Sequence, residues 1–146
     1  MLTIRAFRSS DQSAARALIE EGLGEHFGCI DRDANPDLVD IEASYSKPNC
    51  AFLVAEVDGE LVGTTGLVLD AGCARLVRVG VARNHRRTGV ASALLEKAIE
   101  LAAAAGVHEV IAYTQPEWAA AMAFYVEHGF EPYGRDDIDV HLKRRI

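Results

Sequence analysis

The segment 74–106 constrains the fold of this chain more than any other part of the sequence. Residues 74–81 (ARLVRVGV) form a largely apolar run of strand length, and a polar loop, ARNHRRT, follows it directly. From Gly89 onward, apolar residues recur at helical spacing as far as Ala102. This pattern predicts a long amphipathic helix that ends near Gly106. A strand, a basic loop and a helix are therefore contiguous, and the turn from loop to helix falls at Gly89.

The junction between this loop and this helix is a candidate anion-binding site. The first backbone N–H groups of a helix have no intrahelical partner, and they lie at the positive end of the helix dipole. Arg86 and Arg87 add positive charge, and Gly89 permits close approach of the backbone. A diphosphate is the natural ligand for such a site. The chain has neither the GxxxxGK[ST] pattern of a mononucleotide loop nor the GxGxxG pattern of a dinucleotide-binding fold.

Strands are predicted wherever apolar and polar residues alternate. Asp58-Gly59 predicts a tight hairpin turn between two such runs, because both residues tolerate positive φ angles. In the strand at 74–81, strict alternation would place Val77, Val79 and Val81 on one face, and Leu76, Arg78 and Gly80 on the other. The other expected strands lie at 2–7, 51–57, 60–69, 108–114 and 138–143.

Three further helices are predicted. The first follows the capping residues Ser10-Asp11, a short one covers 38–43, and the last has Pro116 and Glu117 in its first turn and ends at Gly129. The region 24–49 otherwise reads as irregular and is a candidate substrate-binding loop. This element order predicts a central mixed sheet flanked by helices, in a single domain over residues 1–146.

Composition narrows the classes of function. A net charge of −7 argues against nucleic-acid binding and is compatible with a cationic partner. No apolar run is long enough for a signal peptide or a membrane span, so we expect a cytoplasmic protein with no membrane partner. Three widely spaced cysteines predict free thiols, and the histidines lack metal-ligand spacing, so no metal is expected.

Two segments resemble the GNAT superfamily of N-acetyltransferases. The loop Arg86-Arg-Thr-Gly89-Val-Ala91 is similar to that family's pattern Arg/Gln-x-x-Gly-x-Gly/Ala, and AFYVEHGF at 123–130 is similar to its late Phe-Tyr-x-x-x-Gly-Phe segment. The element order agrees as well, so the resemblance covers almost the whole chain. It implies an α/β (α+β) fold with a mixed, mostly antiparallel sheet and helices on both faces. It also implies that acetyl-CoA is the acetyl donor.

The resemblance further implies which residues hold the cofactor. The backbone of Val79 and Val81 would hydrogen-bond the pantetheine arm, and the Val81 amide would face the developing oxyanion. The arginines and the amides from Arg87 to Ser92 would hold the diphosphate. The implied cofactor-binding residues are Val79, Val81, Arg86, Arg87, Thr88, Gly89, Val90, Ala91 and Ser92.

The same resemblance assigns Tyr125 as the general acid that protonates the departing thiolate. The alternative is a core contact, because Trp118, Ala121 and Met122 share helical spacing with Tyr125. No general base is evident, since Tyr113 stands where some relatives carry Glu. Trp118 stands where many relatives carry a cofactor-contacting Asn. The base candidates in the irregular region are Glu25, His26, Asp31 and Asp33.

The sequence thus predicts an acetyl-CoA-dependent N-acetyltransferase that acts directly on a primary amine of a small molecule or protein. The alternative is a non-catalytic acyl-CoA-binding regulatory module. Nucleic-acid binding through residues 83–87 is disfavoured, because the basic stretch is short on an acidic chain. A homodimer formed through exposed final strands is a further expectation.

Overall fold

The computed structural model describes residues 1–28 and 35–146, which build a seven-stranded sheet in the order β1-β2-β3-β4-β5-β7-β6. The strands β4 and β5 run parallel, and the other neighbouring strands run antiparallel. The strand bounds are β1 Leu2–Ala6, β2 Cys50–Val57, β3 Glu60–Asp70, β4 Cys73–Val81, β5 Glu109–Thr114, β6 Glu131–Arg135 and β7 Val140–Arg145.

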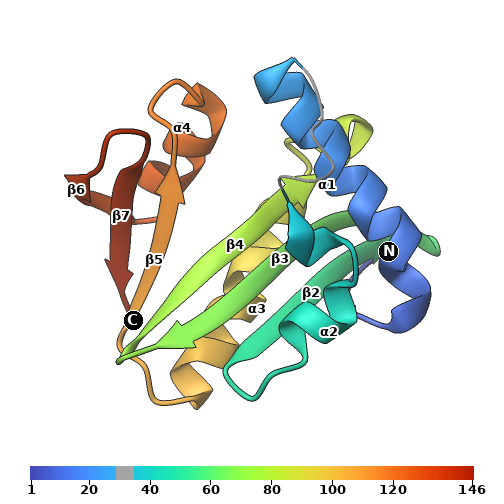
Figure 1. Cartoon of the computed structure of the whole chain (residues 1–146), viewed down its shortest axis with the longest axis horizontal. Coiled ribbons are helices and arrows are strands. Elements are labelled where there is room, and N and C mark those ends of the chain that lie inside the picture. The colour runs from blue at the N-terminus through green and yellow to red at the C-terminus, as the bar shows by residue number, and fades with distance from the viewer. Residues whose placement is uncertain (29–34) are drawn as a thin grey trace.

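Helices cover both faces of this sheet (Figure 1). Helices α1 and α2 lie on one face with a core around Phe52 and Val54, while α3 and α4 pack against the other face. The alternation of side chains along β2 explains this division. Phe52 and Val54 point to the core under α1 and α2, whereas Leu53 and Ala55 point to the core under α3 and α4. The predicted mixed, mostly antiparallel sheet with helices on both faces is confirmed. The helix bounds are α1 Gln12–Phe27, α2 Ile41–Tyr45, α3 Val90–Ala104 and α4 Ala119–Glu127.

Helix α1 is longer than the sequence suggested. It continues to Phe27 and ends where Gly28 adopts a φ of 78°. Glu25 and His26 therefore lie on the last turn of a helix, and the expectation of an irregular loop is wrong for them. Tertiary packing outweighs the low helix propensity of Gly22 and Gly24. The candidates Asp31 and Asp33, with Cys29, lie outside the described residues.

Two elements near the C-terminus also differ from expectation. Pro116 and Glu117 precede α4, which begins at Ala119, and residues 131–135 form the unpredicted edge strand β6. An edge strand tolerates Pro132, which has no N–H to donate. The final strand begins at Val140, because the amides of Ile138 and Asp139 donate to the Asp136 carboxylate in a tight turn.

A bulge in β4 overturns the expected alternation of its side chains. Thr64 of β3 pairs with Gly80, but Gly66 pairs with Val77, so Arg78 and Val79 together oppose a single residue. Arg78 has a φ of 52°, in the left-handed region that side chains seldom adopt. The extra residue places Val79 beside the α3 core, whereas Val77 packs near Gly66 on the opposite face.

Candidate active site

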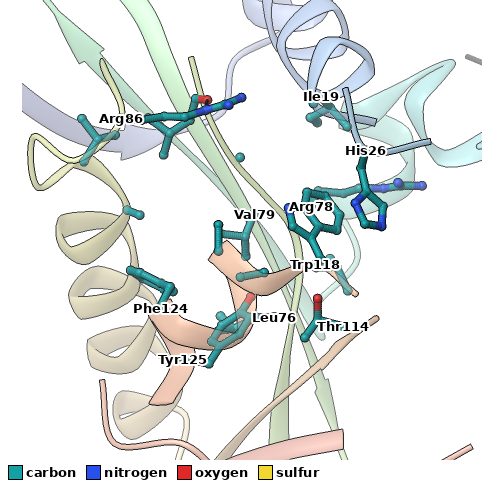
Figure 2. Close-up of a pocket in the computed structure, with 18 of the residues that line it drawn as sticks. Ile19, His26, Leu76, Arg78, Val79, Arg86, Thr114, Trp118, Phe124 and Tyr125 are labelled. Carbon is teal, nitrogen blue, oxygen red and sulfur yellow. Dashed lines mark hydrogen bonds between the residues drawn. The ribbon is translucent and has the colours of Figure 1, made fainter. Parts of the chain in front are cut away.

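A cleft opens where β4 and β5 separate. The two strands pair only from Cys73 to Leu76 and from Glu109 to Ala112, so the edge of β4 after Leu76 has no β5 neighbour. The cleft has a volume of about 1310 Å³ and is lined by β4, the end of α1, the start of α3 and one face of α4. Figure 2 shows Arg86 at one end of the cleft and His26, Trp118 and Arg78 toward the other.

Six consecutive backbone N–H groups at the start of α3 have no acceptor among the described residues. They belong to residues 87–92, and the first intrahelical bond of α3 runs from the Ala93 amide to the Gly89 carbonyl at 3.0 Å. Arg87 and Gly89 have φ angles of 62° and 89°, which curl the loop tightly into the helix. Such alternation of left-handed residues turns successive amides toward one concave surface that suits an anion.

The two arginines of this loop differ in their surroundings. Arg86 donates through both terminal nitrogens to Glu25, at 2.8 and 2.9 Å, and through Nε to the Val81 carbonyl at 3.1 Å. Arg87 is exposed and forms no ion pair within the described residues. Arg86 therefore braces the loop against α1 and β4, while the guanidinium of Arg87 is available to a ligand.

The register of β3 and β4 orients the backbone of Val81. Val81 faces Gly63, and the Ala82 amide donates to the Val62 carbonyl at 2.8 Å. In an antiparallel ladder this makes Val81 and Gly63 a non-hydrogen-bonded pair, so the Val81 N–H points away from β3. It points to the strand edge that borders the cleft. Val79 lines the same cleft from within the bulge.

Tyr125 has a buried ring and a hydroxyl directed at the cleft. Its side chain belongs to the core beside Phe130, with the two ring centroids 5.2 Å apart. Figure 2 shows the phenol oxygen pointing from α4 toward Val79. Burial raises the pKa of Tyr125 above its usual value, which keeps the phenol protonated. The ring therefore packs in the core while the residue also borders the cleft, and the general-acid role stays a prediction.

Ser92 and His128 connect the start of α3 to the end of α4. The His128 Nδ1 lies 2.8 Å from the Phe124 carbonyl, which can only accept, so Nδ1 donates to it. In the neutral ring, Nε2 then accepts from the Ser92 hydroxyl at 2.8 Å. This contact occupies the Ser92 side chain and leaves its backbone amide free.

His26 and Trp118 meet across the cleft. Their rings stack with centroids 4.3 Å apart and planes 13° apart, and His26 Nε2 lies 3.1 Å from the Gln115 side-chain oxygen. No described residue hydrogen-bonds to Nδ1 of His26. Trp118 is half-buried at the start of α4 and lines the cleft, so it is not a core residue.

Of the described base candidates, Glu25 is the poorer one. Hydrogen bonds from Arg86 lower the pKa of this carboxyl from 4.5 to about 2, because they stabilise its charged form. A base with so low a pKa seldom takes a proton from an ammonium group. His26 combines an accessible ring nitrogen with a position in the cleft.

Sequence reasoning did not find a polar cluster that lines the cleft where it reaches α2. Arg78 donates to both oxygens of Asp37, at 2.6 and 2.9 Å, and to the Asn35 side chain at 3.0 Å, while the Tyr45 hydroxyl donates to Asp37 at 2.7 Å. Partial burial of Asp37 favours its neutral form, but the bonds from Arg78 and Tyr45 outweigh it and hold the pKa below its usual value. No local pattern in the sequence signals this cluster, because its members are separated by up to 43 positions.

Within the residues that the structure describes, no cluster of His, Cys, Asp and Glu has the geometry of a metal site. Among the same residues, no helix has the length and apolar character needed to cross a membrane.

Residues 12–130 match the model of the acetyltransferase (GNAT) family. The chain belongs to this family. GNAT relatives include a probable N-acetyltransferase camello of Xenopus tropicalis, 35% identical over 111 residues that make up 73% of this chain and 51% of that protein. An IAA acetyltransferase of Azospirillum brasilense is 29% identical over 92% of both chains. The chain spans about half the length of camello and of rat N-acetyltransferase 8, at 51% and 53%.

Solved GNAT structures have the same architecture. An acetyltransferase of Staphylococcus aureus Mu50 superposes with a TM-score of 0.90 at 25% identity, and each chain is covered to 99%. The PaiA N-acetyltransferase of Thermoplasma acidophilum, solved in complex with coenzyme A, superposes with a TM-score of 0.89 at 18% identity, over 100% of this chain and 99% of that one. The GNAT fold predicted from the sequence is thus confirmed.

Proposed function

We propose that this GNAT protein is an acetyl-CoA-dependent N-acetyltransferase that transfers the acetyl group directly to a primary amine. The observation that carries the proposal is the run of six amides over residues 87–92 for which the described part of the chain provides no acceptor, next to a cleft large enough for an extended ligand. Unpaired amides at a helix start bind anions, and a diphosphate can accept from several of them at once. Family membership supports the same choice of ligand.

In this proposal, different residues along the cleft bind different parts of acetyl-CoA. The amides of residues 87–92 and the guanidinium of Arg87 hold the diphosphate. The pantetheine arm lies along the free edge of β4 and hydrogen-bonds to the backbone of Val79 and Val81, as an added strand would. The Val81 N–H stabilises negative charge that develops on the thioester oxygen during attack by the amine.

Tyr125 supplies the proton that the departing thiolate needs. Its high pKa keeps it protonated near neutral pH, and the transfer becomes favourable only as charge develops on a neighbouring sulfur. His26 accepts the proton that the amine must lose, directly or through water, because its ring lines the cleft and no described residue hydrogen-bonds to Nδ1. Replacement of His26 by Phe should keep the stacking on Trp118 and slow turnover by about 10²-fold or more.

Calorimetric titration with coenzyme A tests the binding half of the proposal. Gly89→Glu introduces a carboxylate at the amides and strains a residue with a φ of 89°, so binding should be lost. Gly72→Glu is a matched control, since Gly72 has a φ of 88° in the turn between β3 and β4 and open space around it. Equal affinity in the wild type and both variants would disprove the assigned site.

Release of free thiol from acetyl-CoA with a panel of amines tests the catalytic half. The wild type should turn over, and Tyr125→Phe should lower kcat by about 10²- to 10⁴-fold with little change in coenzyme A affinity. Intact coenzyme A binding without turnover of any amine would favour the non-catalytic acyl-CoA-binding module instead.

A further inference from the structure

The bulge of β4 places Arg78 where its guanidinium bonds to Asp37 and where the residue lines the cleft. Without the inserted residue, strict alternation would place Arg78 on the face opposite Val77, but here the guanidinium reaches Asp37, near Tyr45. The left-handed φ of 52° at Arg78 is unfavourable for a long side chain such as that of arginine. Strained backbone of this kind is retained in folded proteins mainly at functional positions.

The hydrogen bonds of this cluster leave one part of Arg78 unused. Nε and Nη2 donate to Asp37 and Asn35, which fixes the plane of the guanidinium. Asp37 accepts three hydrogen bonds, from Arg78 and Tyr45, so its charge is largely satisfied. Nη1 of Arg78 has no acceptor among the described residues, and Arg78 lines the cleft. A fixed guanidinium with two free N–H groups is a binding site for a carboxylate.

Charge in the cleft also differs from charge on the whole chain. The described lining residues include four arginines, at positions 75, 78, 86 and 87, against three carboxylates, at positions 25, 37 and 127. Glu25 is paired with Arg83 and Arg86, and Asp37 is paired with Arg78. The acidic excess of the chain, −7, therefore lies outside the cleft. The described carboxylate that contacts Arg78 is Asp37, which is already paired and so offers little to a purely cationic acceptor.

We propose that Arg78 binds a carboxylate of the acceptor, so that the acceptor is a small amine that also carries a carboxylate, such as a free amino acid. This inference rests on the proposed acetyltransferase function and specifies its substrate class. Arg78 precedes Val81 by three residues, about 10 Å along a strand, which a guanidinium side chain and one small molecule together span. Leu18, Ile19 and Leu23 of α1 also line the cleft and suit an apolar side chain.

Three acceptors of one shape test the proposal. Leucine, leucinamide and 3-methylbutylamine share a side chain and an amine, but only leucine has a carboxylate. The wild type should acetylate leucine with a kcat/KM about 10- to 100-fold above that of the other two, the range expected for a charge-assisted hydrogen bond. Leucinamide is less basic than leucine and has more free amine at neutral pH, so basicity cannot produce the preference for leucine over leucinamide.

Arg78→Gly removes the guanidinium and relieves the strained φ. It should raise KM for leucine by about 10- to 100-fold and change KM for leucinamide by less than about threefold. Because it leaves Asp37 unpaired, the double variant Arg78→Gly with Asp37→Asn should be measured as well and should behave alike. Arg75→Gln is the matched control, since Arg75 lies on the same strand with its guanidinium 5.6 Å from the Tyr113 ring centroid. It should keep the preference for leucine.

Calorimetry separates a failure of this inference from a failure of the proposed function. N-acetyl-leucine should bind the protein in the presence of coenzyme A, and should bind at least about tenfold more weakly to Arg78→Gly. Binding with that dependence but without turnover supports the inference and contradicts the acetyltransferase. Turnover of all three amines at equal kcat/KM, or equal losses in Arg75→Gln and Arg78→Gly, would overturn the inference and leave the acetyltransferase standing.

Discussion

Glu25 and Arg86, 61 positions apart in the chain, form an ion pair with two hydrogen bonds of 2.8 and 2.9 Å. The pair connects the last turn of α1 to the loop before α3, and Arg83 adds a third contact to the same carboxylate at 3.3 Å. A negative charge therefore stands beside the amides to which we assign a diphosphate.

Replacement of Glu25 by Gln should tighten coenzyme A binding by a few fold. The change removes a charge that repels the diphosphate and releases two guanidinium groups to it. Titration at low and at high salt should show a larger gain at low salt, because screening weakens the repulsion. Glu96→Gln, the same change on the exposed side of α3, should have no effect. Weaker binding would mean that Glu25 positions Arg86 for the ligand.

The same ion pair should make stability depend on pH in a defined window. Arg86 lowers the pKa of Glu25 from 4.5 to about 2. Since the folded-state pKa is the lower one, the pair stabilises the fold above about pH 4.5 and loses this contribution as the pH falls toward 2. The Tm difference between wild type and Glu25→Gln should therefore shrink across that window. A difference that is constant from pH 7 to pH 2 would contradict the assignment.

The phenol of Tyr125 should ionise at a clearly higher pH than phenols do in unfolded chains. Burial raises its pKa, so the tyrosinate absorbance of wild type and Tyr125→Phe should coincide up to about pH 10 and diverge only above it. In urea all four tyrosines should ionise together near pH 10, which provides the control. Divergence below pH 10 would show that the phenol is solvated.

Gly63 should be essential for the close packing of α3 against β3. A Cβ at this position would lie 2.8 Å from Val90 Cγ1 and 2.9 Å from Leu94 Cδ1. Gly63→Ala should therefore cost about 1–3 kcal/mol in unfolding free energy, and the shift of α3 should weaken coenzyme A binding. Gly22→Ala, with open space around it inside α1, should instead stabilise the fold by about 0.5–1 kcal/mol. Denaturant unfolding measures both, and equal effects would refute the packing argument.

Neutralisation of Asp11 should lower the unfolding free energy more than neutralisation of an exposed carboxylate. It is 7% exposed, accepts two hydrogen bonds from Arg5 at 2.8 and 2.9 Å, and also accepts from the Arg8 amide. Asp11→Asn should lower the unfolding free energy by about 3 kcal/mol at pH 7. Because Arg5 lowers the pKa of Asp11, this difference should decline as the pH falls below 3.8.

Asp58→Asn is the control for Asp11, because Asp58 forms an ion pair with the N-terminus and is 85% exposed. Its cost should stay below about 1 kcal/mol in the same denaturant experiment. A comparable loss in both variants would show that burial does not govern the strength of these pairs.

Local periodicity was enough to predict most of the fold. The hairpin at Asp58-Gly59 is confirmed with both residues at positive φ, and the helix after Gly89 spans Val90–Ala104. These features depend on residues close together in the chain, so a single window of sequence contains the information. The strand β6 was missed because five exposed residues around Pro132 show no alternation.

The site divides in the same way. The loop of residues 86–91 and the Phe-Tyr segment at 124–125 were recognisable in the sequence, because a helix start and its flanking glycine are local features. The partners of these residues were not recognisable in the sequence. The ion pair of Arg86 with Glu25 and the stacking of His26 on Trp118 appear only in three dimensions.

By itself, then, the sequence determined the order of all the elements except β6, the family and the position of the amides at the start of α3. The tertiary structure alone decided that a bulge turns Arg78 toward Asp37, 41 positions away, and that α1 supplies Glu25 and His26 to the cleft. The physical reason is that a bulge and an ion pair depend on how two distant backbones meet. A one-residue change of register alters which face a side chain occupies without any change in the local pattern.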